Sequence, residues 1–177
     1  MFWEIIIKTA IVHTLTYFIV GFTAFTVFNY TATLSHEKSN MRPATDILVR
    51  AGVLFQPVRG VFFGIIIFLL KDILILQSNG WLITWLMFVI VGILGTFAPA
   101  ASSLEGLIYL KQGIGTNWGG LIEILTQSFL LSVITFFWVN NPDLNWLDWA
   151  IGIPFLLSLL LPTLGLLSGQ KETKHDI

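Results

Sequence analysis

Cysteine is absent from the 177-residue chain, and charged residues make up only 11% of it. Without cysteine there can be no disulfide bond, no thiolate metal site and no cysteine nucleophile. Soluble domains carry about one quarter charged residues, so a chain with this few cannot form an ordinary water-facing surface. The net charge of −1 also gives no basic field that would attract a phosphate backbone, which argues against nucleic acid as a partner.

Apolar residues make up 55% of the chain and include 15 phenylalanines and seven tryptophans, which suits contact with membrane lipids. A helix needs about 20 mostly apolar residues to cross a hydrocarbon core of about 30 Å. Five segments meet this length: 5–28, 58–77, 81–98, 119–139 and 147–168. We therefore predict a single all-α transmembrane domain, a bundle of five spans with a short polar tail at 169–177.

Two connecting segments have the pattern of short helices that lie along the membrane surface. Residues 45–56 alternate apolar runs with Asp46 and Arg50, whose i,i+4 spacing is that of a helical ion pair. Residues 102–112 begin with a Ser-x-x-Glu pattern that ends at Glu105, which is typical of a capping box at a helix N-terminus. Both segments are predicted on the cytoplasmic side.

Glycine and proline positions predict how the spans pack. The turn 78–80 joins the second and third spans and predicts an antiparallel hairpin. Gly60 and Gly64 stand four apart, which either lets a neighbouring helix approach closely or reflects chance in an apolar stretch. Pro154 and Pro162 each remove a backbone N–H from the fifth span and should kink it unless neighbouring groups compensate.

Orientation follows from the positions of the nine lysines and arginines. Cytoplasmic segments of membrane proteins are enriched in these residues. Only Lys8 and Lys71 lie near the opposite face if the N-terminus is outside. The other seven then fall on one side: Lys38, Arg42, Arg50, Arg59, Lys111, Lys171 and Lys174. We predict an external N-terminus and a cytoplasmic C-terminus.

Within the spans, His13 is the candidate for a functional polar group near the middle of the membrane. Together with Thr9, Thr16 and Tyr17 it forms a polar stripe at helical spacing. A neutral histidine bonded to a neighbouring helix explains this stripe, and a proton-relay, haem or metal role is the alternative. The other two histidines lie in a connection and in the tail, so we expect neither a metal nor a cofactor.

A cluster of polar residues is predicted at the cytoplasmic ends of the spans. Glu123 lies about one turn inside the fourth span, where a carboxyl group usually pairs with a cation or stays protonated, and its candidate partners are Arg59 and Arg50. A functional pocket and a structural ion pair both fit this position. The full candidate cluster is Asp46, Arg50, Gln56, Arg59, Glu105, Glu123 and Gln127.

Three stretches resemble a group of small bacterial polytopic membrane proteins that has no assigned activity. They are 55–60 (FQPVRG), 80–82 (GWL) and 103–109 (SLEGLIY), and the likeness extends over about residues 40–130. The resemblance implies a location in the bacterial inner membrane. It assigns no catalytic residue.

The sequence contains no G-x-S-x-G, Walker or H-E-x-x-H motif. We expect a protein for the passage or sensing of a small solute or ion, whose path lies between the protomers of a homo-oligomer. The second hypothesis is a membrane-embedded enzyme for a lipid-linked or phosphate-bearing substrate, in which Glu105 or Glu123 is the acid/base and the arginines hold phosphate. The third is an accessory or effector subunit that packs against a partner membrane protein. Membrane lipids are the expected surroundings in each case.

Overall fold

The computed structural model describes residues 1–30, 42–97, 100, 102–110 and 118–172 of the chain, and within these ranges every regular element is helical. Four of the described helical segments are long and apolar enough to cross a membrane: Phe2–Val27, Gly52–Leu69, Trp118–Asn140 and Asn145–Ser168. The predicted all-α class and the membrane character of the helices are confirmed to this extent.

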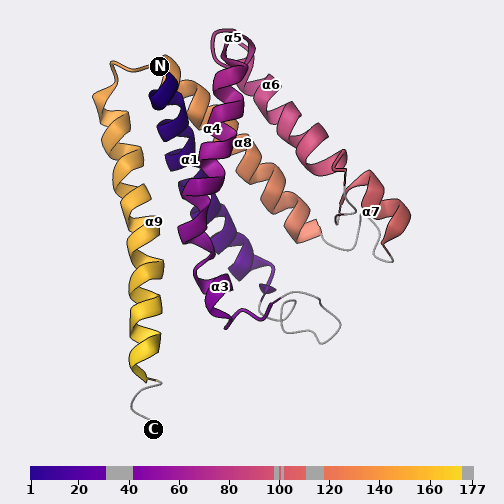
Figure 1. Cartoon of the computed structure of the whole chain (residues 1–177), viewed down its shortest axis with the longest axis vertical. Coiled ribbons are helices and arrows are strands. Elements are labelled where there is room, and N and C mark those ends of the chain that lie inside the picture. The colour runs from indigo at the N-terminus through magenta and orange to yellow at the C-terminus, as the bar shows by residue number, and fades with distance from the viewer. Residues whose placement is uncertain (31–41, 98–99, 101, 111–117, 173–177) are drawn as a thin grey trace.

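The helices run alternately up and down the bundle (Figure 1). The N-terminus and α5 lie at one end, and α3, α7 and the start of α8 lie toward the other. In chain order the described elements are α1 (Phe2–Val27), α3 (Ile47–Arg50), the 3₁₀ helix η1 (Gly52–Phe55), α4 (Gln56–Leu69), α5 (Lys71–Leu74), α6 (Gly80–Met87), the π-helix η2 (Phe88–Leu94), α7 (Leu104–Tyr109), α8 (Trp118–Asn140) and α9 (Asn145–Glu172).

Helices α1, α8 and α9 match three of the predicted spans, and the other two spans differ. The second was predicted at 58–77, but its helical stretch runs from Gly52 to Leu69, because η1 leads directly into α4 and the backbone leaves the α conformation at Leu70 (φ −105°, ψ 19°). The third was predicted at 81–98, but its apolar helical stretch is Gly80–Leu94, which is shorter than the four candidate spans.

The predicted surface segments are shorter than expected. Residues 45–56 form the single turn of α3 followed by η1, and the predicted segment 102–112 contains the six-residue α7. Residues 111–112 and the end of the tail, 173–177, lie outside the described residues. The prediction of orientation also used four lysines whose side chains lie outside the described residues: Lys38, Lys111, Lys171 and Lys174.

Helix α1 is the centre of the bundle, and α4 packs closely against it through two glycines. A Cβ atom added to Gly60 would lie 2.5 Å from the Ala10 Cα, and one added to Gly64 would lie 2.7 Å from the Ile6 Cα. No side chain larger than hydrogen fits at these distances. The close-approach interpretation of the Gly60–Gly64 pair is therefore confirmed.

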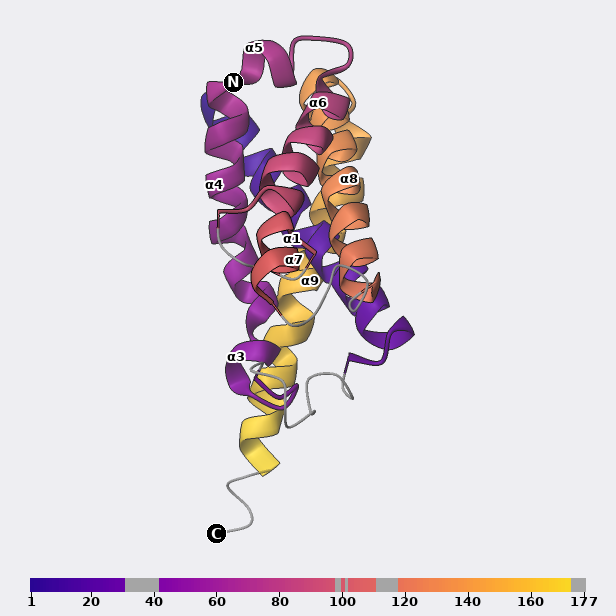
Figure 2. The ribbon, with the colours of Figure 1, turned by 90° about the vertical axis from the view of Figure 1, so that its right-hand side faces the viewer.

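Helices α4 and α6 run in opposite directions, as the hairpin prediction requires, but they do not pack together along their length. The main partner of α4 is α1, whereas the main partner of α6 is α8. Figure 1 shows the two helices close together at α5 and well apart at their other ends, and Figure 2 shows α6 beside α8. The connection includes α5, so it is longer than a tight turn and allows the two helices to diverge.

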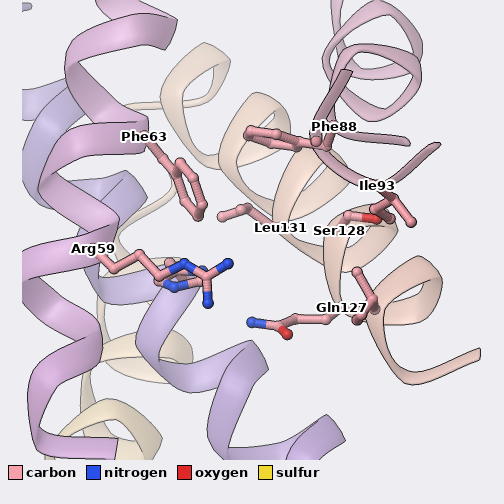
Figure 3. A pocket seen from close by; sticks show the side chains of 10 residues that line it. Arg59, Phe63, Phe88, Ile93, Gln127, Ser128 and Leu131 are labelled. Atoms are coloured by element: carbon pink, nitrogen blue, oxygen red, sulfur yellow. The ribbon is translucent and has the colours of Figure 1, made fainter. Parts of the chain in front are cut away.

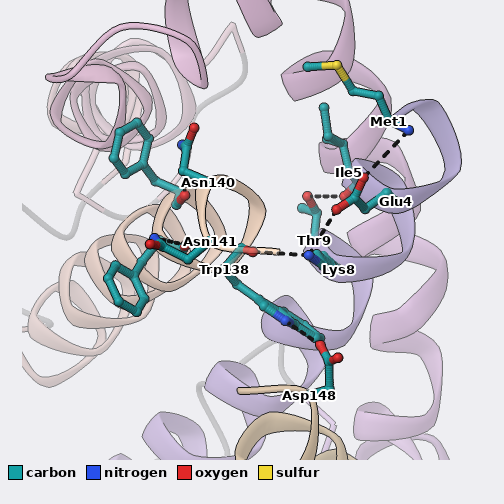
Figure 4. A network of polar contacts seen from close by, with 11 residues as sticks. Met1, Glu4, Ile5, Lys8, Thr9, Trp138, Asn140, Asn141 and Asp148 are labelled. Atoms are coloured by element: carbon teal, nitrogen blue, oxygen red, sulfur yellow. Dashed lines mark hydrogen bonds and ion pairs between the residues drawn. The ribbon is translucent and has the colours of Figure 1, made fainter. Parts of the chain in front are cut away.

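A polar network ties α1, α8 and α9 together at the end of the bundle that carries the N-terminus (Figure 4). The Lys8 Nζ lies 3.0 Å from the Glu4 carboxylate and also donates to the backbone carbonyl of Trp138 at 3.0 Å. The Trp138 indole N–H in turn donates to Asp148 at 2.8 Å. This network satisfies a carbonyl in the last turn of α8, which has no partner within its own helix.

Helix α9 continues as one helix through Pro154 and Pro162 (Figure 1). It packs mainly against α1, η1 and α3, and most of its surface remains exposed. Near its C-terminal half, the Arg50 guanidinium donates a 2.7 Å hydrogen bond to the Gly165 carbonyl. This bond attaches the α3 turn to α9.

Candidate functional site

The divergence of α4 from α6 and η2 leaves a cavity of about 210 Å³ inside the bundle, which we call the Arg59 cavity. Its walls come from α1, α4, η2 and α8, and Figure 3 shows side chains from these elements facing one another across it. The polar lining residues are His13, Arg59, Gln127 and Ser128, and the apolar ones include Phe63, Phe88 and Ile93. Among the described residues, none of those that line this cavity is acidic.

Arg59 supplies the charge of this cavity. Its guanidinium group extends from α4 into the cavity, and the Gln127 side chain extends toward it from α8 (Figure 3). Within the described residues Arg59 forms no ion pair, and its recorded contact is with the ring of Phe63, 5.4 Å from the guanidinium carbon to the ring centre. The cationic group therefore faces a space without a protein anion.

His13 is held in place by the start of α4. The Gln56 amide nitrogen donates to the Gly52 carbonyl at 3.0 Å, so the Gln56 Oε1 faces the His13 Nε2 at 3.2 Å and accepts its hydrogen. The ring also meets the Phe63 ring edge to face, with centres 4.9 Å apart. The hydrogen bond to a residue of another helix agrees with the first interpretation of His13, and the ring lies at the wall of the Arg59 cavity.

The rest of the predicted intramembrane stripe is satisfied within α1 or directed elsewhere. Thr9 donates to the Ile5 carbonyl at 2.6 Å, and Thr16 donates to the Val12 carbonyl at 2.8 Å. The Tyr17 hydroxyl lies near Gly52, 3.8 Å from the position of an added Cβ atom, and is not part of the Arg59 cavity lining.

Glu123 lies in a second cavity, of about 320 Å³, between α1 and α8, which we call the Glu123 cavity. Its Oε2 accepts a 2.7 Å hydrogen bond from the Tyr30 hydroxyl. Burial and this carboxylate together raise the pKa of Tyr30, which therefore remains a neutral donor. The expected ion pair of Glu123 with Arg59 or Arg50 is not formed, because Arg59 faces the other cavity and Arg50 binds the Gly165 carbonyl.

Asp46 and Glu105 lie apart from both cavities. Asp46 caps α3 by accepting from the Leu48 N–H at 2.8 Å, and it pairs with Arg42 at 2.9 Å and not with Arg50. The hydrogen bond from Arg42 is the main reason why the pKa of Asp46 is below its usual value. Glu105 lies in the first turn of α7, which is separated from α1 and α4 in Figure 1.

The capping box predicted from Ser102 and Glu105 is wrong by one residue. The N-cap of α7 is Ser103, whose hydroxyl oxygen accepts from the Gly106 N–H at 2.9 Å. Ser102 has a positive φ of 71°, a conformation incompatible with the extended backbone of an N-cap. Because Ser102 and Ser103 are adjacent, the sequence allows either to be the N-cap. The positive φ of Ser102 leaves Ser103 in that position.

The candidate cluster therefore divides into separate groups. Arg59 and Gln127 line the Arg59 cavity together with His13, and Gln56 forms a hydrogen bond with His13. Glu123 lines the Glu123 cavity. Asp46, Arg50 and Glu105 belong to neither cavity.

Sequence reasoning missed the contributions of Phe88, Gly92 and Tyr30. Phe88 and Gly92 line the Arg59 cavity because residues 88–94 form a π-helix, for which the apolar sequence carries no signal. Tyr30 reaches Glu123 because the chain turns at Asn29, which has a φ of 49°. Asparagine tolerates this left-handed conformation and is common after a helix C-terminus, so Asn29 was a usable signal for the turn.

Comparison of the chain with protein-family models, with curated proteins and with solved structures finds no match. The functional assignment therefore depends on the geometry of the two cavities.

Proposed function

We propose that this protein is a membrane protein that binds a small anion in the Arg59 cavity and acts in the passage or sensing of that anion. The observation that carries the proposal is a guanidinium group directed into a cavity whose lining, in the part of the chain that the structure describes, contains no carboxylate. The Arg59 side chain is exposed, so its charge is open to a ligand that enters the cavity. A bound anion would supply the missing counter-charge.

The neighbours of Arg59 suit an anion with several oxygen atoms. Gln127 can donate from its amide and lies opposite Arg59 (Figure 3), whereas the Ser128 hydroxyl, which also lines the cavity, donates to the Leu125 carbonyl at 3.0 Å. Guanidinium groups bind carboxylate and phosphate oxygens through two parallel hydrogen bonds. The chemistry therefore favours a phosphate or carboxylate group, which belongs either to a soluble anion or to a lipid headgroup.

The catalytic alternative receives less support from the geometry. An enzyme for a phosphate-bearing lipid needs an acid or base beside the bound phosphate. Glu105 lies on α7, and Glu123 lies in the other cavity, so neither carboxyl group lines the Arg59 cavity. Binding without chemistry is the simpler function for this arrangement.

Anion binding is tested with purified protein in maltoside detergent, using inorganic phosphate and a short-chain phosphatidylglycerol as probes. Arg59→Gln should weaken binding at least tenfold, because it removes the charge while keeping a similar length. Preference for phosphate indicates a soluble anion, whereas preference for the lipid indicates a headgroup. Failure of wild-type protein to bind either probe, or equal binding by Arg59→Gln, refutes the proposal.

The cavity itself is tested by filling it from η2. A Cβ atom added to Gly92 meets no neighbour within 4 Å, so Gly92→Phe can place a ring in the Arg59 cavity without a backbone clash. Gly152→Phe on α9 is the matched control, because its added Cβ also meets nothing. We expect Gly92→Phe to reduce binding, and flux in liposomes if the protein is a transporter, and Gly152→Phe to change neither.

The proposal includes five crossings, an external N-terminus, a bacterial inner-membrane location and a homo-oligomer with the path between protomers. The absence of cysteine makes the topology directly testable. A cysteine at the exposed Asn79 should react with an impermeant maleimide from outside the cell, and one at the exposed Thr45 only after lysis. The reverse pattern contradicts the orientation, and a monomer that conducts the anion in liposomes contradicts the path between protomers.

A further inference from the structure

The Glu123 cavity contains a carboxylate with unused bonding capacity. One oxygen of Glu123 accepts from Tyr30, while no hydrogen bond to the other oxygen is recorded within the described residues. No lysine or arginine of the described ranges forms an ion pair with Glu123. The cavity therefore holds an acidic group with one oxygen bound to Tyr30 and the other beside Gly21 of α1, 3.5 Å from the position of an added Cβ atom, and its charge is opposite to that of the arginine in the Arg59 cavity.

The remaining walls of the Glu123 cavity are mainly apolar and partly aromatic. Val20, Ala24 and Phe28 line it from α1 and its C-terminal end, and the ring of Phe28 stacks on that of Tyr30 with centres 6.2 Å apart. Gly119 makes room for Phe28, because an added Cβ atom would lie 2.7 Å from that ring. The ring of Phe28 is thus packed between Tyr30 and Gly119, and the aliphatic walls suit an alkyl group.

The donor set is poor for a metal ion. Calcium takes six to eight oxygen ligands, and magnesium demands near-ideal octahedral geometry. The Glu123 cavity offers one carboxylate and the hydroxyls of Thr23 and Thr126, and the Thr23 hydroxyl already donates to the Ile19 carbonyl at 2.8 Å. A ligand that needs one counter-charge and much apolar contact fits better than one that needs many oxygens.

We propose that the Glu123 cavity binds an organic ammonium group. The carboxylate of Glu123 pairs with the ammonium charge, and the apolar walls contact the attached hydrocarbon. The ammonium group belongs either to a soluble amphiphilic amine or to the headgroup of an amino lipid. This site is separate from the Arg59 cavity and carries the opposite charge, so it does not depend on anion binding.

Alkyltrimethylammonium ions with butyl and octyl chains test the proposal by equilibrium dialysis against protein in maltoside detergent, with protein-free micelles subtracted. We expect saturable binding that strengthens with chain length and weakens at least tenfold in Glu123→Gln. The glutamine oxygen can still accept from Tyr30, so this variant should fold, which its melting temperature and elution volume verify. Glu123→Asp should retain part of the affinity.

Glu105→Gln is the matched control, because it also removes one acidic charge but outside both cavities, and its binding should equal that of wild type. Arg59→Gln should reduce anion binding and leave ammonium binding intact, which separates the two proposals. Competition by short-chain phosphatidylethanolamine but not by phosphatidylglycerol identifies an amino lipid, and no competition by either indicates a soluble amine. Equal binding by wild type and Glu123→Gln, or no binding by wild type, overturns the ammonium site.

Discussion

The two sides of α4 differ in how closely they meet their neighbours. On one side Gly60 and Gly64 bring α4 into backbone contact with α1, and on the other side α4 separates from α6 and η2 around the Arg59 cavity. Both sides carry apolar side chains, with Ile67 in a buried cluster with Ile5 of α1 and Phe63 in the lining of the Arg59 cavity. In lipid, close packing depends on small residues at the interface, and the positions of the glycines therefore determine which side closes and which stays open.

The largest effect is expected from Gly64→Ala, which breaks the closed side. The new methyl group would lie 2.7 Å from the Ile6 Cα, so α1 and α4 must separate. We expect the free energy of unfolding to fall by about 2–3 kcal/mol, even though alanine gains about 1 kcal/mol in helix propensity. The measurement is unfolding in a mixed detergent. Gly152→Ala, where the methyl group meets nothing, should show no loss, and equal behaviour of the two variants would contradict the close contact.

A smaller effect is expected from Lys8→Met, which weakens the contact of α1 with α8 at the end of the bundle that carries the N-terminus. This change removes both the hydrogen bond to the Trp138 carbonyl and the ion pair with Glu4. We expect a loss of about 1–2 kcal/mol, measured in the same unfolding assay. Lys71→Met is the control, because the Asp72 carboxylate that Lys71 contacts is 76% exposed and such surface pairs contribute little. A loss for Lys71→Met as large as that for Lys8→Met would show that the Trp138 contact is unimportant.

Next in size is Ser103→Ala, which removes the N-cap of α7 beyond the open side. Loss of an N-cap costs about 1 kcal/mol, and because α7 is short, the loss should be local. We expect faster hydrogen exchange at the Gly106 amide with little change in the melting temperature of the whole protein. Ser102→Ala should leave the exchange of that amide unchanged. The opposite result would restore the register predicted from the sequence.

The smallest effect is expected from Gly92→Ala on the open side. The added methyl group meets no atom within 4 Å, so stability should change by less than about 0.5 kcal/mol in the unfolding assay. The contrast with Gly64→Ala is the direct measure of the difference between the two sides of α4. A large loss in Gly92→Ala would mean that the added methyl group is crowded and that the Arg59 cavity is closed at Gly92.

The sequence was sufficient to predict the class of fold and the approximate positions of α1, α8 and α9, because these features depend on the length and apolar character of continuous segments. For Gly60 and Gly64 it left close approach and chance open, and the structure decides for close approach. The limits of the second span were harder to predict, because the apolar run continues through Leu70 while the backbone does not remain helical there. Hydropathy indicates whether a segment lies in lipid or in water. It does not detect a local break in the hydrogen bonds of the helix.

The candidate site was predicted in its parts but not in its partners. Arg59, Gln127 and His13 were recognised as unusual polar groups in apolar surroundings, and they line one cavity. Glu123 was expected to bind an arginine but binds Tyr30, because the pairing depends on the turn at Asn29 and on the rotation of α8 about its axis. Neither quantity can be derived from the spacing of residues along a single helix.

The Lys8 network also affects how charge is distributed along the bundle. Antiparallel helices place opposite ends of their dipoles side by side, and here the positive N-terminal end of α1 lies beside the negative C-terminal end of α8. Glu4 lies in the first turn of α1, and Lys8 binds a carbonyl in the last turn of α8. Glu4 thus offsets the positive end of the α1 dipole, and Lys8 offsets the negative end of the α8 dipole. Together the two side chains add no net charge to this end of the bundle. The orientation rule counts lysines and arginines and not net charge, so Lys8 remains one of the two cations on the outer side of the predicted orientation.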